Sequence, residues 1–201
     1  MASLSLVTGP TLEPVTLAEA QEHCRVDSRA EDAFLTRAIQ TAREYVESVT
    51  NRALITQTWD WTLDRFPCAT SFEVPRPNLL SVTSISYMDT DGATQTWAST
   101  NYRVGVRAGP KAQPGRIELA YQQSYPLTRS VIDAVTIRFI AGYHATAATA
   151  VTNCPAALKS AILLLVGEMY ERRTEVIVGT ISTPNVLRAA SLMAPYVVRR
   201  W

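Results

Sequence analysis

The stretch CPAALKSAILLLVGEMYERRTE, residues Cys154–Glu175, predicts a helix that is apolar on more than one side. Pro155 opens it, where the fixed φ and the missing N–H of proline cost least. The first side has the spacing of a buried stripe and carries Leu158, Ala161, Ile162, Leu165, Val166 and Met169. The second side, where a surface helix would carry charge, holds Leu163, Leu164, Gly167 and Tyr170. Such a helix needs packing partners on two sides, which indicates a protein that packs against other proteins.

Two helices are predicted near the start of the chain. Thr16 with Glu19, and Ser28 with Glu31, match the capping-box pattern, and the second helix runs to about Asn51. Its apolar face carries Leu35, Ala38, Ile39, Ala42, Val46 and Val49. Its opposite, polar face carries Arg37, Arg43, Glu44 and Glu47. We expect these two helices to form a hairpin.

The pattern changes to a period of two after the second helix. Ile55–Leu63 alternates apolar and polar residues, as a half-buried strand does. Further strand candidates, separated by Gly and Pro, are Ser71–Val74, Val82–Met88, Thr94–Ala98, Tyr102–Val106, Arg116–Ala120 and Ala134–Ile140. A three-residue loop at Thr90–Gly92 would place Ile85 opposite Trp97, which pairs two large apolar side chains. Short strands at this spacing predict a small sheet, sandwich or open barrel.

The order of helices, strands and helices predicts an α+β fold. We expect a small helical bundle, formed by the N- and C-terminal helices, with an inserted antiparallel β-sheet or sandwich subdomain. The expected parts are a helical hairpin at 1–54, a β-rich insertion at 55–141, an Ala/Thr-rich linker at 142–154 and C-terminal helices with a tail at 155–201. Thr183 and Pro184 would open a last helix at Val186–Ala194, which Pro195 stops.

Composition and charge narrow the class of protein. The 201 residues are 47% hydrophobic and only 18% charged, which suggests that part of the surface is normally covered. The net charge of +1 gives no general attraction to nucleic acid or to an anionic membrane. Three widely spaced cysteines fit a reducing compartment, and we expect a cytosolic, soluble chain with no secretory signal and no membrane span.

No residues in the sequence point to catalysis, and we predict no catalytic, cofactor-binding or metal-ligating residues. His23 and Cys24 are helical neighbours that point about 100° apart, and His144 has no partner at zinc spacing. Nucleophile-elbow and phosphate-loop motifs are missing. One alternative is a binding module in which the aromatic side chains Trp59, Trp61 and Trp97 present a carbohydrate- or nucleic-acid-binding face. Large aromatic residues in a small sheet more often form its core.

The C-terminal tail is the segment where we favour interaction with a partner. It has no acidic residue from Val176 to Trp201, and it carries large apolar residues together with arginine and aromatic residues, the types enriched at interface hot spots. The candidate interface residues are Arg188, Leu192, Met193, Tyr196, Val197, Val198, Arg199, Arg200 and Trp201. The alternative is a tail folded back on its own helices, and both hold if one face packs inward while the end projects.

Five segments together resemble the phage head–tail connector proteins, the gp6-like and phi-E125 gp8-like adaptor family. They are EPVTLAEAQEHCRVDSRAEDAFLTRAIQTAREYVESVTNRALITQTW, VPRPNLLSVTSISYMDTDGATQTW, FIAGY, PAALKSAILLLVGEMYERRTEV and LMAPY. These are packing and turn patterns rather than catalytic signatures, and they span nearly the whole chain. The sequence departs from the family pattern in the Ala/Thr-rich linker and beyond Tyr196.

The resemblance implies a structural role in the virion neck. Family members form a ring, usually dodecameric, beneath the portal protein and join it to the stopper or tail-completion protein. The C-terminal segment would dock on the portal, and the second side of the two-faced helix would meet the next copy or tighten the chain's own packing. DNA would pass through the lumen without specific binding, which suits a net charge of +1. Another neck or tail-completion component is a closely related alternative.

Overall fold

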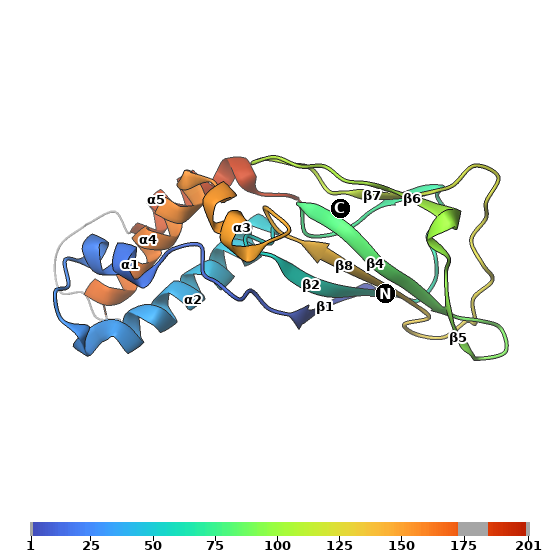
Figure 1. Cartoon of the computed structure of the whole chain (residues 1–201), viewed down its shortest axis with the longest axis horizontal. Coiled ribbons are helices and arrows are strands. Elements are labelled where there is room, and N and C mark those ends of the chain that lie inside the picture. Colours follow the sequence, from blue (N-terminus) through green and yellow to red (C-terminus); the bar gives the residue numbers. More distant parts are fainter. Residues whose placement is uncertain (1, 173–184, 200–201) are drawn as a thin grey trace.

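The chain is elongated, with its helices gathered at one end and its β-sheets at the other (Figure 1). The structure is a computed structural model that describes residues 2–172 and 185–199. Both the bundle of terminal helices and the inserted antiparallel sheets are present, so the predicted α+β class is confirmed. The division into four parts stays a prediction.

Four α-helices of the described chain contribute to one core at the helical end. They are α1 (Leu17–Cys24), α2 (Asp32–Thr50), α4 (Ala156–Glu171) and α5 (Asn185–Met193). The predicted capping box at Thr16 is confirmed. The Thr16 hydroxyl accepts a hydrogen bond from the Glu19 N–H at 3.2 Å, and the Thr16 N–H donates to the Glu19 carboxylate at 2.6 Å. Ser28 caps a 3-10 turn at Arg29–Glu31 instead, so α2 begins later than predicted.

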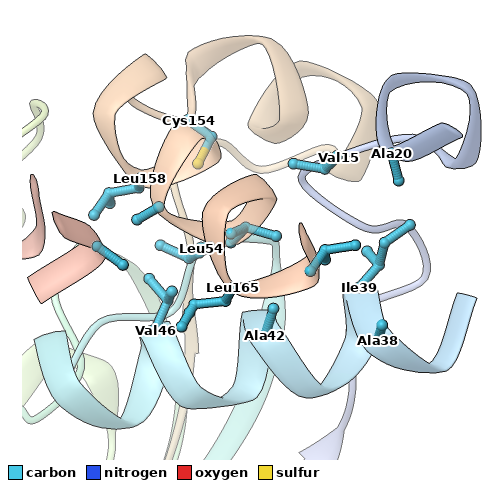
Figure 2. Packing of buried hydrophobic residues seen from close by; sticks show 14 of the residues in the cluster. Val15, Ala20, Ala38, Ile39, Ala42, Val46, Leu54, Cys154, Leu158 and Leu165 are labelled. Atoms are coloured by element: carbon cyan, nitrogen blue, oxygen red, sulfur yellow. The ribbon is translucent and has the colours of Figure 1, made fainter. Parts of the chain in front are cut away.

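Helix α4 lies in the middle of this core, as Figure 2 shows. Five of the six residues predicted for its first stripe are buried, and the sixth, Met169, packs against the core while partly exposed. The opposing α2 contributes Leu35, Ala38, Ile39, Ala42 and Val46, the apolar face predicted from sequence. Burial of these side chains supplies the main stabilisation of the bundle.

Two antiparallel sheets form the other end. The five-stranded sheet has the order β1-β2-β8-β4-β5, and the three-stranded sheet has the order β3-β7-β6. The bounds are β1 Ala2–Thr8, β2 Gln57–Leu63, β3 Ser71–Glu73, β4 Leu79–Met88, β5 Thr94–Thr96, β6 Tyr102–Gly105, β7 Arg116–Leu119 and β8 Val135–Ala141. Strand β1 was not predicted. It lies along the edge of β2, with Ala2 opposite Leu63, so the chain begins on the sheet rather than in the helical hairpin.

The β4–β5 hairpin has the predicted register. Tyr87 lies opposite Gln95, and the Trp97 N–H donates to the Ile85 carbonyl at 2.8 Å. Gly92 has φ +90°, a left-handed conformation that glycine adopts without steric cost. The turn residues and the pairing of large apolar side chains therefore fix the same register.

The expected linker at 142–154 contains a short helix, α3 (Ala147–Asn153). Ala150 of α3 is buried, so the segment expected as a linker forms a helix that buries part of its surface. Gly142 precedes it with φ +150°, and a Cβ there would lie 2.8 Å from the Thr56 backbone. No single helix of the described chain is long and apolar enough to span a membrane. Helices α3 and α4 have the required length and composition only when taken together, and they are bent by 93° relative to each other.

Candidate interaction surfaces

The second side of α4 is largely covered by the chain itself. Gly167 is buried, and a Cβ there would lie 3.2 Å from Nε2 of His23 on α1. Tyr170 meets Phe34 of α2 edge-on, with ring centroids 6.2 Å apart. Leu163 and Leu164 are half-buried against the same core. The second side of α4 was expected either to meet the next copy in a ring or to pack within the chain. These contacts favour packing within the chain, and an interface with a neighbouring copy stays a prediction.

Helix α5 divides the predicted C-terminal docking residues into two groups. Met193 is 1% exposed and packs in the helical core together with Ala189, and Leu192 is half-buried there. The outer face keeps Arg188 exposed beside Leu187, which is 58% exposed. Met193 is therefore a core residue, because the α5 stripe that reaches α4 carries it inward. Leu187 joins the outward surface.

The chain folds back after α5. A 3-10 turn at Ala194–Tyr196 leads into an extended end, and the Val198 N–H donates to the Thr50 carbonyl at 3.0 Å. Val197 remains 40% exposed and Arg199 is exposed, while Val198 is half-buried. The predicted docking residues Arg200 and Trp201 lie outside the described residues. The tail thus packs inward by its backbone and presents side chains outward.

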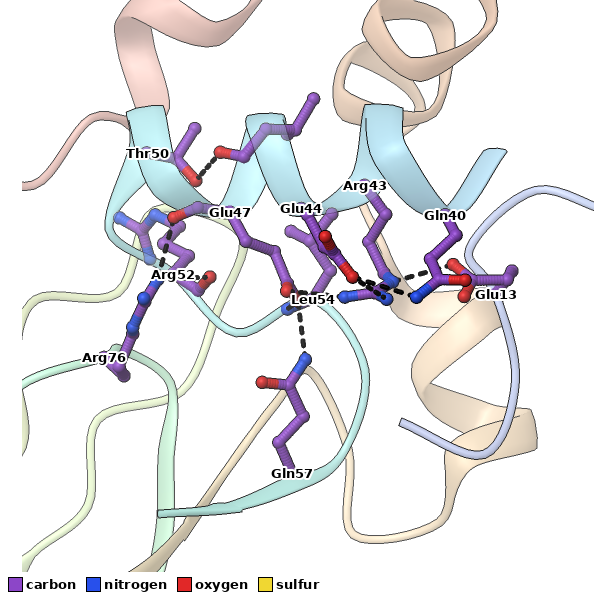
Figure 3. Close-up of polar contacts among 11 residues, drawn as sticks. Glu13, Gln40, Arg43, Glu44, Glu47, Thr50, Arg52, Leu54, Gln57 and Arg76 are labelled. Atoms are coloured by element: carbon purple, nitrogen blue, oxygen red, sulfur yellow. Dashed lines mark hydrogen bonds and ion pairs between the residues drawn. The ribbon is translucent and has the colours of Figure 1, made fainter. Parts of the chain in front are cut away.

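A buried polar network joins the helices to the sheet, as Figure 3 shows. Arg43 and Glu47 lie on the polar face of α2, as predicted, but they are only 5% and 6% exposed. Glu47 accepts from Arg43 Nη1 at 3.0 Å, from the Leu54 N–H at 2.8 Å and from Gln57 Nε2 at 2.7 Å. Glu13 binds Arg43 Nε at 2.8 Å. Burial raises the pKa of Glu47, while the Leu54 N–H and Arg43 favour its charged form.

The aromatic residues proposed as a ligand face belong instead to the β core. Trp59 and Trp97 are 9% and 5% exposed. Trp97 stacks on Tyr102 at 5.1 Å between ring centroids, and the Arg76 guanidinium lies 4.7 Å from the Trp59 ring centroid. Only Trp61 is partly exposed. An aromatic binding face made of all three tryptophans is therefore wrong, because the two sheets close over them.

An exposed apolar loop lies between β7 and β8, and sequence analysis did not single it out. Tyr121, Leu127 and Ile132 are each more than 80% exposed. The loop lies at the sheet end, away from the helices (Figure 1). Its signal in the sequence is a long stretch between two strands that lacks helical or strand periodicity.

The described residues contain no group of three or more His, Cys, Asp or Glu side chains placed to hold a metal ion. Cys154 is buried in the helical core, and burial raises the pKa of its thiol to about 12, so it is a poor nucleophile.

Comparisons with known proteins agree in sequence and in fold. Residues 14–86 match the model of the phage gp6-like head-tail connector proteins. A chain from the virion of a native gene transfer agent (GTA) particle is 25% identical with a TM-score of 0.77, covering 98% of this chain and 96% of that one. A chain from the neck of an empty GTA particle, computed with C6 symmetry, is 22% identical with a TM-score of 0.77, covering 99% and 97%.

A third similar chain comes from the neck of a native GTA particle computed with C12 symmetry. It is 23% identical with a TM-score of 0.71, covering 99% of this chain and 97% of that one. No curated protein matches the chain significantly in sequence. The matched segment contains α1, α2, β2, β3 and most of β4, and the fold of the remainder is that of the neck proteins as well. Residues 14–86 of this chain therefore match the domain of the phage gp6-like head-tail connector proteins.

Proposed function

We propose that this protein is a structural connector in the neck of a tailed phage or a phage-like particle. The observation that carries the proposal is the agreement of nearly the whole chain with a GTA virion protein, added to the connector-family match at residues 14–86. In this role the protein is a virion component that catalyses no reaction.

The protein works as one subunit of a homo-oligomeric ring. The C6 and C12 symmetries of the similar neck structures support a ring, with twelve copies as the expected number. Each contact in such a ring joins two different patches of adjacent copies, so an elongated subunit with separate exposed surfaces suits it. DNA passes through the lumen, and a net charge of +1 does not hold it there by counterion release.

The ring lies between the portal protein and the stopper or tail-completion protein. The portal contacts the outer face of α5 and the end of the tail, where Leu187, Arg188, Val197 and Arg199 are exposed. Arginine is enriched among the residues that carry binding energy at interfaces, and exposed apolar side chains grouped on a surface mark interaction sites. Arg200 and Trp201 follow Arg199 in the sequence, and we assign them to the same surface on that ground only.

The test uses the portal protein of the same particle and a chain that ends at Val198. This truncation removes Arg199–Trp201 and keeps the backbone hydrogen bond of Val198. We expect the full chain to form a ring on the portal in native mass measurements and electron micrographs. The truncated chain should unfold at the same urea concentration and fail to attach. Equal attachment of both chains would overturn portal docking by the tail.

A further inference from the structure

Arg52 lies where three distant segments of the chain meet. It is 1% exposed and directly follows Asn51, the left-handed residue that ends α2. Its Nε donates to the Tyr196 carbonyl at 2.7 Å, and its Nη1 donates to the Ala112 carbonyl, in the loop between β6 and β7, at 2.9 Å. One side chain therefore holds the tail against the loop between β6 and β7.

The guanidinium of Arg52 has no acidic partner among residues 2–172 and 185–199. Burial lowers its pKa, and the neighbouring Tyr143 hydroxyl favours the charged form. A buried cation is costly unless hydrogen bonds satisfy it, so the two carbonyls take the place that a carboxylate usually fills. Hydrogen bonds from a charged donor are also stronger and more directional than neutral ones. Arg52 thus selects one placement of the backbone at Tyr196.

The residues on either side of this contact strengthen it. Asn51 Nδ2 donates to the Val198 carbonyl at 2.9 Å, and the Val198 N–H donates to the Thr50 carbonyl at 3.0 Å. The three consecutive residues Thr50–Arg52 therefore bind the backbone of Tyr196–Val198 at both ends. Lys111 adds a cation above the Tyr196 ring, 5.7 Å from its centroid.

These contacts fix the path of the backbone at Tyr196–Val198. With its neighbours' backbone bound, Val197 remains 40% exposed. Val198 and Arg199 line a largely apolar cleft of about 390 Å³, together with Leu4, Trp61 and Pro75. The backbone contacts carry no side-chain specificity of their own. They set the direction in which the exposed side chains of the tail point.

We propose that Arg52, with Asn51, is the positioning residue of the C-terminal docking segment. It holds residues 196–198 in one path, so that a partner meets Val197 and Arg199 already ordered and association costs less conformational entropy. The identity of that partner rests on the proposed function. The placement of the segment by Arg52 does not depend on it.

The experiment follows amide hydrogen exchange in the full chain, using Arg52→Met and Arg52→Lys. The reporter is the Val198 amide, and the reference is the Leu165 amide inside α4. We expect Arg52→Met to speed exchange at Val198 roughly 10- to 100-fold and to leave Leu165 near its wild-type rate, because a local contact to a charged donor is lost. Arg52→Lys, which keeps the charge but not the two-pronged donor, should restore part of the protection.

Two further variants control for folding and for charge. Arg103→Met removes an exposed arginine of β6 and should change neither amide. Asn51→Gly keeps the left-handed backbone at φ 55° and removes only the side-chain bond to Val198, so it stays informative should Arg52→Met fail to fold. We expect Asn51→Gly to speed exchange at Val198 as well.

The outcomes separate this inference from the proposed function. Unchanged Val198 exchange in folded Arg52→Met and Asn51→Gly would overturn it, and so would equal acceleration at Val198 and Leu165, which would make Arg52 a general stabiliser. Selective acceleration at Val198 with weakened attachment to the portal supports both proposals. Selective acceleration with undiminished attachment supports the positioning role and overturns portal docking.

Discussion

Helices α4 and α5 are both rich in apolar residues, yet the surroundings of their apolar faces are opposite. The second side of α4 meets His23 of α1 and Phe34 of α2. On the outer face of α5, Leu187 is 58% exposed among the described residues. An apolar face therefore indicates an external interface only after the chain's own helices have been placed.

The same comparison applies to polar residues. Arg43 and Glu47 have the i, i+4 spacing of a surface ion pair, but residues Glu13 and Gln57 close over them. Arg138 and Asp60 form a pair with comparable geometry, at 2.7 Å between Nη2 and Oδ2, on the exposed face of the sheet. The distances alone do not distinguish the two ion pairs. Their contributions to the free energy of unfolding differ, because only the Arg43–Glu47 pair is buried away from water.

The largest effect is expected from Glu47→Ala. The substitution leaves the buried Arg43, the Leu54 N–H and Gln57 without their shared acceptor, so the free energy of unfolding should fall by about 3–5 kcal/mol. Urea unfolding of the isolated chain measures it. Glu44→Ala is the matched control, because Glu44 also contacts Arg43, at 3.4 Å, but is 58% exposed. Equal losses from both variants would mean that water reaches the Glu47 network in solution.

An intermediate effect is expected from Gly167→Glu, which tests whether the second side of α4 is covered. Its Cβ would already lie 3.2 Å from His23 Nε2, and a buried carboxylate must follow, so we expect a loss of about 2–4 kcal/mol in the isolated chain. Gly9→Glu, where the nearest atom is 3.8 Å away, should be nearly neutral. A Gly167→Glu chain that is as stable as wild type but forms no ring would assign this side to a neighbouring copy.

Local patterns predicted much of this molecule. The Thr16 capping box, the β4–β5 register around Gly92 and the buried stripe of α4 each depend on residues close in sequence, and each is present. Strand β1 was missed because an edge strand shows little burial, and its evidence is its pairing with β2 some 55 residues later. The coverage of Glu47 likewise depends on distant segments.

The candidate site shows the same limit. Arginine and apolar side chains marked the tail as a candidate partner interface, which stays a prediction, and Val197 and Arg199 are exposed there. Met193 could not be separated from them, because which side of α5 meets α4 is decided by the packing of the whole bundle. Arg52 gave no signal, since a single arginine after a helix is usually solvated. Its role depends on Tyr196, 144 residues away.

The smallest effect on stability, with a large effect on assembly, is expected from Leu187→Glu. Leu187 is 58% exposed, so the free energy of unfolding should change by no more than about 0.5 kcal/mol. Attachment to the portal should fail, because a buried interface would have to take an unpaired carboxylate. Leu127→Glu is the matched control, because it adds the same charge at a leucine that is 82% exposed at the sheet end. It should change neither stability nor attachment. If instead Leu127→Glu abolished attachment and Leu187→Glu did not, the portal would meet the sheet end, and the exposed face of α5 would be free for the next component of the neck.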